Sequence, residues 1–207
     1  SFASETPVTD GRRVYVYFGS IGLLAAINLS GETVWTAETG VFNGGQEFGS
    51  AASPAIHEDR IYVVNDNTTN SFLAAFDTAT GEKMWSVERD ETENWSTPFV
   101  WQNEIRDEIV TTGRRKIRSY DVDGNLLWEL GGMTVNVVPT PFASEGLLYL
   151  SSGYPGGFPR PVYAVRPGAS GDISLLEDAT TNEFVAWSQP LLGTYSTSAL
   201  VYGGSYY

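Results

Sequence analysis

The stretch AAFDTATGEKMW, residues 74–85, holds the local pattern that decides the fold. An apolar run ends at Asp77, a polar turn continues to Gly81, and a second run ends at Trp85. The short side chain of Asp77 can hydrogen-bond the turn backbone, and a glycine accepts the positive φ that tight hairpin turns require. The pattern therefore predicts strand, turn and strand, with a large aromatic ring packed on the returning strand.

Near-copies of this hairpin occur elsewhere in the chain. LLAAINLSGETVW (23–35) and KIRSYDVDGNLLW (116–128) both run from strand through a polar turn to tryptophan; the corresponding residues are Asn28, Gly31, Trp35, Asp121, Gly124 and Trp128. A fourth, looser copy at 162–190 carries an insertion of about a dozen residues before Trp187, and we expect a long surface loop there. The hairpin is thus one half of a repeat.

The other half of the repeat begins at a proline. Apolar pairs and alternating strands follow Pro7, Pro54, Pro98 and Pro141 at intervals of about 45 residues, and Ser198 takes the proline's place in a fifth start. Four short strands per unit of about 45 residues are typical of a β-propeller blade. We expect an all-β propeller segment over 1–207, without helices, with blades at 4–40, 50–91, 94–133 and 135–190 and the first strand of a fifth within 192–207.

Composition sets the class of protein. The 207 residues are 42% hydrophobic and 18% charged, which is typical of an ordered globular chain. A net charge of −13 argues against a nucleic-acid partner, and the one basic cluster, GRRKIR (113–118), is interpreted as a strand face whose charges pair across a hairpin. No apolar run is long enough to span a bilayer, so no membrane span is expected.

The repeat resembles that of the pyrroloquinoline-quinone (PQQ)-like β-propellers, whose signature is Ala-x-Asp-x-x-Thr-Gly-x-x-x-Trp. The residues that match in full are Ala75, Asp77, Thr80, Gly81 and Trp85, whereas the first and third units match through glycine and tryptophan only. The resemblance implies that these residues are structural. It also implies a propeller of six to eight blades, so we expect the rest of the ring to come from further blades of the same chain or from another subunit.

Two functions are compatible with this family. The first is a non-enzymatic scaffold like the outer-membrane assembly members, without a cofactor, which binds a protein partner or a ligand in the periplasm or outside the cell. The alternative is a quinoprotein dehydrogenase that uses PQQ and calcium, or a fragment of one. Relatives of that kind use adjacent cysteines, which this chain lacks, and only Trp95 and Trp101 are not assigned to the repeat.

The isolated polar motifs favour structural roles. His57, the single histidine, falls in a turn and has no catalytic partner in the sequence. Residues 121–125 resemble a calcium loop, but an acidic ligand is missing about seven positions beyond Asn125, so a turn is favoured. The acidic segment 88–93 is interpreted as a solvated connector. The sequence therefore predicts no catalytic residue and no metal site.

Two long loops are the candidate binding surfaces. ETGVFNGGQEFGS (38–50) and SSGYPGGFPRP (151–161) are rich in glycine and aromatic residues, and loops of this kind commonly carry binding functions. The candidate contact residues are Phe42, Phe48, Tyr154, Phe158 and Arg160. The alternative is that both are ordinary loops that pack on themselves.

Overall fold

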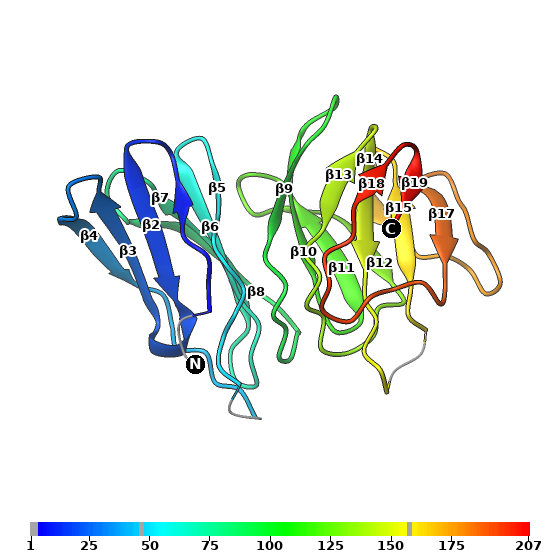
Figure 1. Ribbon diagram of the computed structural model, residues 1–207, viewed down its shortest axis with the longest axis horizontal. Helices are drawn as coiled ribbons and strands as arrows, with labels where there is room; N and C mark the ends of the chain where they lie inside the picture. Colours follow the sequence, from blue (N-terminus) through cyan, green and yellow to red (C-terminus); the bar gives the residue numbers. More distant parts are fainter. Residues whose placement is uncertain (1–3, 46–47, 157–158) are drawn as a thin grey trace. The chain divides into compact units, whose positions relative to one another are not determined.

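The computed structural model describes residues 4–45, 48–156 and 159–207 (Figure 1). The chain forms two compact units, Ser1–Pro98 and Phe99–Tyr207, and each has its own hydrophobic core. Strands dominate both units, as predicted. The described residues contain one short helical turn, the 3-10 segment η1 (Gly19–Ile21), where the sequence predicted none.

The first unit consists of two antiparallel sheets of four strands. Strand order follows chain order in each sheet, because every strand is joined to the next by a short connector. The first sheet contains β1 (Val8–Thr9), β2 (Arg13–Phe18), β3 (Leu23–Asn28) and β4 (Thr33–Glu38). The second contains β5 (Ala55–His57), β6 (Arg60–Asn65), β7 (Phe72–Asp77) and β8 (Lys83–Glu88).

The hairpin of β7 and β8 has the predicted turn chemistry. The Asp77 carboxylate accepts the backbone N–H groups of Ala79 and Thr80 at 2.9 and 2.7 Å and the Thr80 hydroxyl at 2.9 Å. Gly81 adopts a φ of 76° and donates its N–H to the Asp77 carbonyl at 2.9 Å. The returning strand pairs Trp85 with Ala75. The predicted hairpin is therefore confirmed.

The two sheets of the first unit pack face to face around a shared apolar core. Tyr15, Tyr17 and Leu24 of the first sheet belong to the same cluster as Ile61 and Phe76 of the second. Fully burying side chains of this size contributes about 1.5–3 kcal/mol each. The face toward the second sheet thus carries alternate residues of each strand, as a half-buried strand requires.

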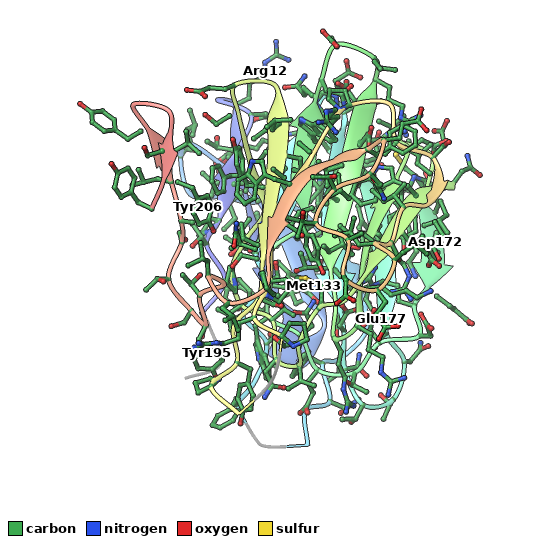
Figure 2. All side chains as sticks on the ribbon, turned by 90° about the vertical axis from the view of Figure 1, so that its right-hand side faces the viewer. Arg12, Met133, Asp172, Glu177, Tyr195 and Tyr206 are labelled. Carbon is green, nitrogen blue, oxygen red and sulfur yellow. The ribbon has the colours of Figure 1, made fainter. Side chains whose placement is uncertain are left out.

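The second unit also contains two main sheets. In the first, β9 (Phe99–Gln102), β10 (Asp107–Thr112), β11 (Lys116–Tyr120) and β12 (Leu126–Gly131) form an antiparallel meander. In the second, the strands are β13 (Phe142–Ser144), β14 (Leu147–Ser151), β15 (Val162–Val165) and β17 (Val185–Gln189). A two-stranded hairpin of β18 (Val201–Tyr202) and β19 (Ser205–Tyr206) follows, and the Tyr206 ring lies 5.9 Å from that of Tyr149 (Figure 2).

The insertion before Trp187 is more than the predicted surface loop. Within it, β16 (Gly171–Asp172) pairs in parallel with Trp128 and Glu129 of β12, so it extends the neighbouring sheet to five strands. Ala169 and Ile173 on either side of β16 are buried in the unit's core, whereas Leu176 is 83% exposed. The expected surface loop is therefore only part of the insertion, because the outer edge of β12 offers unpaired backbone groups that β16 satisfies.

Candidate functional site

Three connectors of the first unit meet at one end of its sheets. They are the connector after β4 (described residues 39–45 and 48–54), the connector after β6 (66–71) and the connector after β8 (89–98). We call these residues the unit-1 loop end. Thr68 donates its backbone N–H and its hydroxyl to the Asn43 carbonyl at 3.0 and 2.7 Å. The Asn65 amide nitrogen donates to the Gly40 carbonyl at 3.2 Å, and Glu93 accepts the N–H of Gly45. These bonds hold loops from different sheets together.

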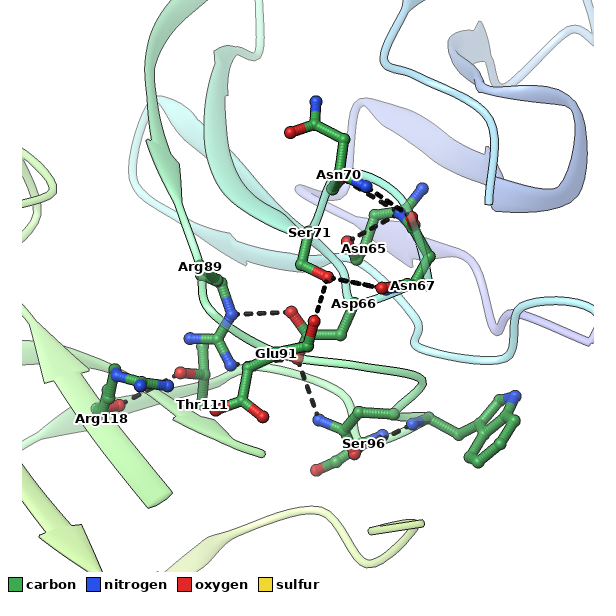
Figure 3. Close-up of polar contacts among 12 residues, drawn as sticks. Asn65, Asp66, Asn67, Asn70, Ser71, Arg89, Glu91, Ser96, Thr111 and Arg118 are labelled. Atoms are coloured by element: carbon green, nitrogen blue, oxygen red, sulfur yellow. Dashed lines mark hydrogen bonds and ion pairs between the residues drawn. The ribbon is translucent and has the colours of Figure 1, made fainter. Parts of the chain in front are cut away.

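A buried ion pair lies within the unit-1 loop end (Figure 3). Arg89 donates Nε and Nη2 to the two carboxylate oxygens of Asp66 at 2.8 and 3.0 Å, and the two side chains are 0% and 1% exposed. The Asn94 side chain adds a hydrogen bond of 3.2 Å to Asp66. A bidentate pair with further hydrogen bonds satisfies the charges that burial removes from water. The pair therefore fixes the connector after β6 to the connector after β8.

A second set of side chains shapes the connector after β6. Asn67 Oδ1 accepts the N–H groups of Thr69 and Asn70 at 2.8 and 2.9 Å. Ser71 accepts the Asn67 N–H at 2.8 Å and donates to the Glu91 carbonyl at 3.0 Å (Figure 3). Asparagine and serine commonly replace backbone partners in this way. Residues 66–71 are thus held from both sides.

A pocket of about 410 Å³ opens beside this connector. One wall is the connector after β4 and the other is formed by β7, β8 and the connector between β6 and β7. The lining residues are Thr39, Gly40, Val41, Asn43, Thr69, Asn70, Phe72, Lys83, Ser86 and Glu88. Hydroxyl and amide groups dominate, with one cation and one anion, so the pocket suits a polar ligand or a peptide segment.

The predicted loop residues of the first unit have different environments. Phe42 is buried, with 7% of its surface exposed, so its ring is not presented to solvent. Phe48 is 66% exposed, and its ring centroid lies 6.4 Å from that of Trp95 in an edge arrangement. Trp95 donates its indole N–H to the Gly49 carbonyl at 2.8 Å. The structure thus joins Phe48 and Trp95 in one aromatic pair at the unit-1 loop end.

The predicted loop of the second unit contacts the connector after β17. The rings of Tyr154 and Tyr195 lie 5.5 Å apart in an edge arrangement, and Tyr195 is labelled in Figure 2. Arg160 donates its backbone N–H to the Pro190 carbonyl at 2.8 Å and accepts the Gly193 N–H at 2.7 Å. Phe158 lies outside the described residues.

The repeat residues lie in the hairpins of their sheets. Gly31 and Gly124 have φ values of 91° and 88°, and Trp85 and Trp187 lie 6.0 Å from the rings of Tyr62 and Tyr149 of their own sheets. Trp35 lies 5.9 Å from Tyr15 in the same arrangement. All of these positions shape or pack the blades.

Trp128 has a partner that sequence reasoning missed. Its indole N–H donates to the carboxylate of Glu108 at 2.7 Å, and both residues are 0% exposed. Ser119, Asn103 and Arg106 also donate to Glu108, at 2.6, 3.2 and 3.1 Å. Four donors satisfy this buried carboxylate. One signal was available. In each of the other three sheets the repeated tryptophan packs on a tyrosine ring, namely Tyr15, Tyr62 or Tyr149. Val110 stands at that position in this sheet, so Trp128 lacks the tyrosine partner.

The isolated polar motifs form no metal centre in the described part of the chain. No three His, Asp or Glu side chains there are grouped so that they could hold a metal ion. The Asp121 carboxylate instead accepts the N–H groups of Asp123 and Asn125, both at 2.9 Å, as the turn interpretation requires. Lys116 of the basic cluster pairs across its hairpin with Glu129 at 2.6 Å.

No helix among the described residues is long and apolar enough to cross a membrane.

Sheets of four antiparallel strands, repeated hairpins and tryptophan anchors define the class: an all-β propeller segment built from PQQ-like repeats. The chain belongs to the PQQ-like repeat family whose model, described as outer membrane protein assembly factor BamB, matches residues 1–207. No curated protein gives a significant match.

Solved structures share the fold at low sequence identity. BamB from Moraxella catarrhalis is 16% identical with a TM-score of 0.55, covering 78% of this chain and 50% of its own. A europium-containing methanol dehydrogenase is 13% identical with a TM-score of 0.59, covering 90% and 41%. The quinohemoprotein alcohol dehydrogenase of Comamonas testosteroni is 18% identical with a TM-score of 0.57, covering 90% and 34%. The chain thus spans half or less of the length of these three proteins.

Proposed function

We propose that the protein is a non-enzymatic scaffold that acts outside the cytoplasm and binds a protein partner through the unit-1 loop end. The observation that carries the proposal is the buried Asp66–Arg89–Asn94 network, which holds these loops in place. A surface that is ordered before binding loses less conformational entropy when the partner arrives. The family's description as an outer-membrane assembly factor supports both the kind of function and the compartment.

The side chains at the unit-1 loop end suit a protein partner. Phe48 and Val41 are 66% and 49% exposed, and both lie on the connector after β4, which also presents the polar side chains of Thr39 and Asn43. Aromatic anchors surrounded by polar groups are characteristic of protein interfaces. The pocket of about 410 Å³ beside these loops offers a place for one side chain of the partner.

Site-specific photo-crosslinking in the native host tests this proposal. A photoreactive phenylalanine analogue is placed at Phe48, and the control carries it at Val34 on β4, which is 43% exposed. We expect a defined crosslinked protein at position 48 and none at position 34, and Phe48→Ala should weaken the purified complex. Equal crosslinking at both positions, or none at either in a correctly folded protein, would contradict the proposal.

The alternative, a PQQ- and calcium-dependent dehydrogenase, rests on fold similarity to two dehydrogenases. The described residues on their own do not fit the calcium ion, since no three acidic or histidine side chains are grouped to hold a metal. The purified protein would be mixed with PQQ and calcium and assayed for dye-linked oxidation of alcohols and sugars. Robust turnover would replace the scaffold proposal.

A further inference from the structure

We propose that the connector after β17 couples the C-terminal hairpin of β18 and β19 to the connection between β14 and β15. That connection, described at residues 152–156 and 159–161, carries the predicted binding loop of the second unit. Undocking of the hairpin loosens the loop. Because coupling of this kind is reciprocal, a partner that binds the ordered loop also favours the docked hairpin. The coupling does not depend on the function proposed for the first unit.

The connector after β17 crosses both ends of the loop. Gly193 donates its N–H to the Arg160 carbonyl at 2.7 Å, and Arg160 donates its N–H to the Pro190 carbonyl at 2.8 Å. A Cβ on Gly193 would lie 2.1 Å from the carbonyl oxygen of Ser152 and 2.7 Å from that of Pro161. Glycine is the residue that permits such a close approach of two backbones. The connector is therefore held by both ends of the loop.

The residues next to Gly193 add to this crossing. Thr194 donates its N–H to the Ser151 hydroxyl at 3.2 Å, where β14 ends. The Tyr195 ring follows, 5.5 Å from that of Tyr154 in the loop. Gly193 and Thr194 are half-buried, whereas the residues on either side of them in the connector are exposed. The crossing is thus the point at which the connector is anchored.

The hairpin of β18 and β19 is docked on its neighbouring sheet through an aromatic ring. The Tyr206 ring lies 6.3, 5.9 and 6.2 Å from three rings of that sheet, which are those of Phe142, Tyr149 and Trp187 (Figure 2). Tyr202 on the other strand is 76% exposed. A two-stranded hairpin is only marginally stable by itself. The order of this hairpin therefore depends on its contact with the sheet.

The link between the hairpin and the crossing is short. The Thr194 hydroxyl donates to the Thr197 carbonyl at 2.9 Å, which closes a turn. Leu200 and Tyr207 exchange backbone hydrogen bonds of 3.0 and 2.9 Å at the open end of the hairpin. Only two residues lie between Thr197 and Leu200. Since two extended residues span about 7 Å, a hairpin that leaves the sheet pulls on the crossing.

Hydrogen exchange of single amides, measured by NMR on the whole chain, tests the coupling. Tyr206→Ala removes the docking ring. We expect exchange of the N–H groups of Gly193, Arg160 and Ser152 to accelerate about tenfold, the effect of one aromatic pair. Tyr206→Phe keeps the ring, and Tyr202→Ala changes an exposed residue of the same hairpin. Both variants should exchange like the wild type.

Gly193→Ala tests the coupling in the opposite direction. Its Cβ disrupts the crossing, so exchange of the Leu200 and Tyr207 N–H groups should accelerate by a similar factor. Leu192→Ala is the matched control, because Leu192 is adjacent but 59% exposed, and it should leave the hairpin unchanged. The amides of β15, which lies between β14 and β17, report on the folded sheet and should stay protected in every variant.

Three results would overturn the coupling. In the first, faster exchange stays within the hairpin in Tyr206→Ala and within the connector in Gly193→Ala. In the second, Tyr202→Ala has the same effect as Tyr206→Ala, so that the docked ring is not responsible. In the third, β15 loses its protection as well, which would mean that the sheet unfolds as a whole rather than through a local link.

Discussion

The indole Nε1 of Trp35 donates a hydrogen bond of 3.0 Å to the carbonyl oxygen of Thr78, in the β7–β8 turn of the neighbouring sheet. Arg13 donates to the same carbonyl at 2.7 Å. The repeated tryptophan of one blade is thus joined to the repeated turn of the next. This contact gives the repeated spacing of turn and tryptophan in the first two sheets a physical reason, because the β7–β8 hairpin is shaped by its own turn and held by the tryptophan of the preceding sheet.

Gly81 in that turn is expected to be intolerant of a side chain. A Cβ at this position would lie 2.5 Å from Trp35 Cε3, and φ is 76°. Gly31 has a φ of 91° in the equivalent turn, but its Cβ would have nothing within 4 Å. Urea denaturation should show that Gly31→Ala costs about 1 kcal/mol for the backbone alone. Gly81→Ala should cost about 1–3 kcal/mol more because of overpacking. Equal losses would show that the Trp35 contact is unimportant.

The Asp66–Arg89 pair is expected to stabilise the first unit strongly. Asp66→Ala leaves a buried guanidinium without its carboxylate, which costs about 3–5 kcal/mol of unfolding free energy. The matched control is Asp59→Ala, because Asp59 pairs with Arg60 at 3.6 Å while its side chain is 66% exposed. Exposed pairs contribute about 0–1 kcal/mol. Chemical denaturation followed by circular dichroism measures both variants, and similar losses would contradict the structural role of the buried pair.

The Asp77 turn is expected to lose its stabilising effect in acid. The Thr80 hydroxyl, with the backbone N–H groups of Thr80 and Ala79, lowers the pKa of the Asp77 carboxyl below its ordinary value of 3.8. The folded state therefore binds fewer protons than the unfolded state in this range. The contribution of the carboxylate to stability is complete above the unfolded pKa and is lost as the pH falls through the folded pKa.

Carbon NMR titration of the Asp77 carboxyl tests this assignment. Thr80→Val removes the hydroxyl that donates to Asp77, which is the largest cause of the lowered pKa, so the pKa of Asp77 should move up toward its ordinary value. Thr80→Ser keeps a hydroxyl and should leave the pKa of Asp77 low. An unchanged pKa of Asp77 in the valine variant would show that the backbone groups alone are responsible.

The insertion that contains β16 is expected to stabilise the second unit through Ile173. This side chain is 3% exposed, and its N–H donates to the Glu129 carbonyl at 2.9 Å. Ile173→Ala should cost about 2–5 kcal/mol, as for other buried aliphatic side chains. Leu176→Ala, in the same insertion but 83% exposed, should change stability by less than about 0.5 kcal/mol. If both variants were neutral in thermal denaturation, the insertion would be a dispensable loop.

Local chemistry made the hairpins predictable. The roles of Asp77, Thr80 and Gly81 depend on atoms within four residues of one another, so short sequence patterns report them reliably. The period of about 45 residues and the alternation of apolar residues then predict sheets of four strands. The interpretation of 121–125 as a turn followed from the same local reasoning.

Features that join distant segments were not predictable in the same way. The sequence gives no sign that Phe42 in a glycine-rich loop is buried, and the missing tyrosine at Val110 does not by itself show that Glu108 is buried on a strand, because burial depends on what packs against each residue. The pairing of β16 with β12 was missed for a similar reason: a two-residue strand has no periodicity of its own.

By itself, the sequence determined the repeating hairpins, the all-β class and the family, since each depends on turn residues and periodicity within a single unit. The tertiary structure alone decided which charged groups are buried together, as in Asp66 with Arg89 and Glu108 with Trp128. The physical reason is that electrostatic and packing energies depend on distances between atoms far apart in the chain, and folding sets those distances.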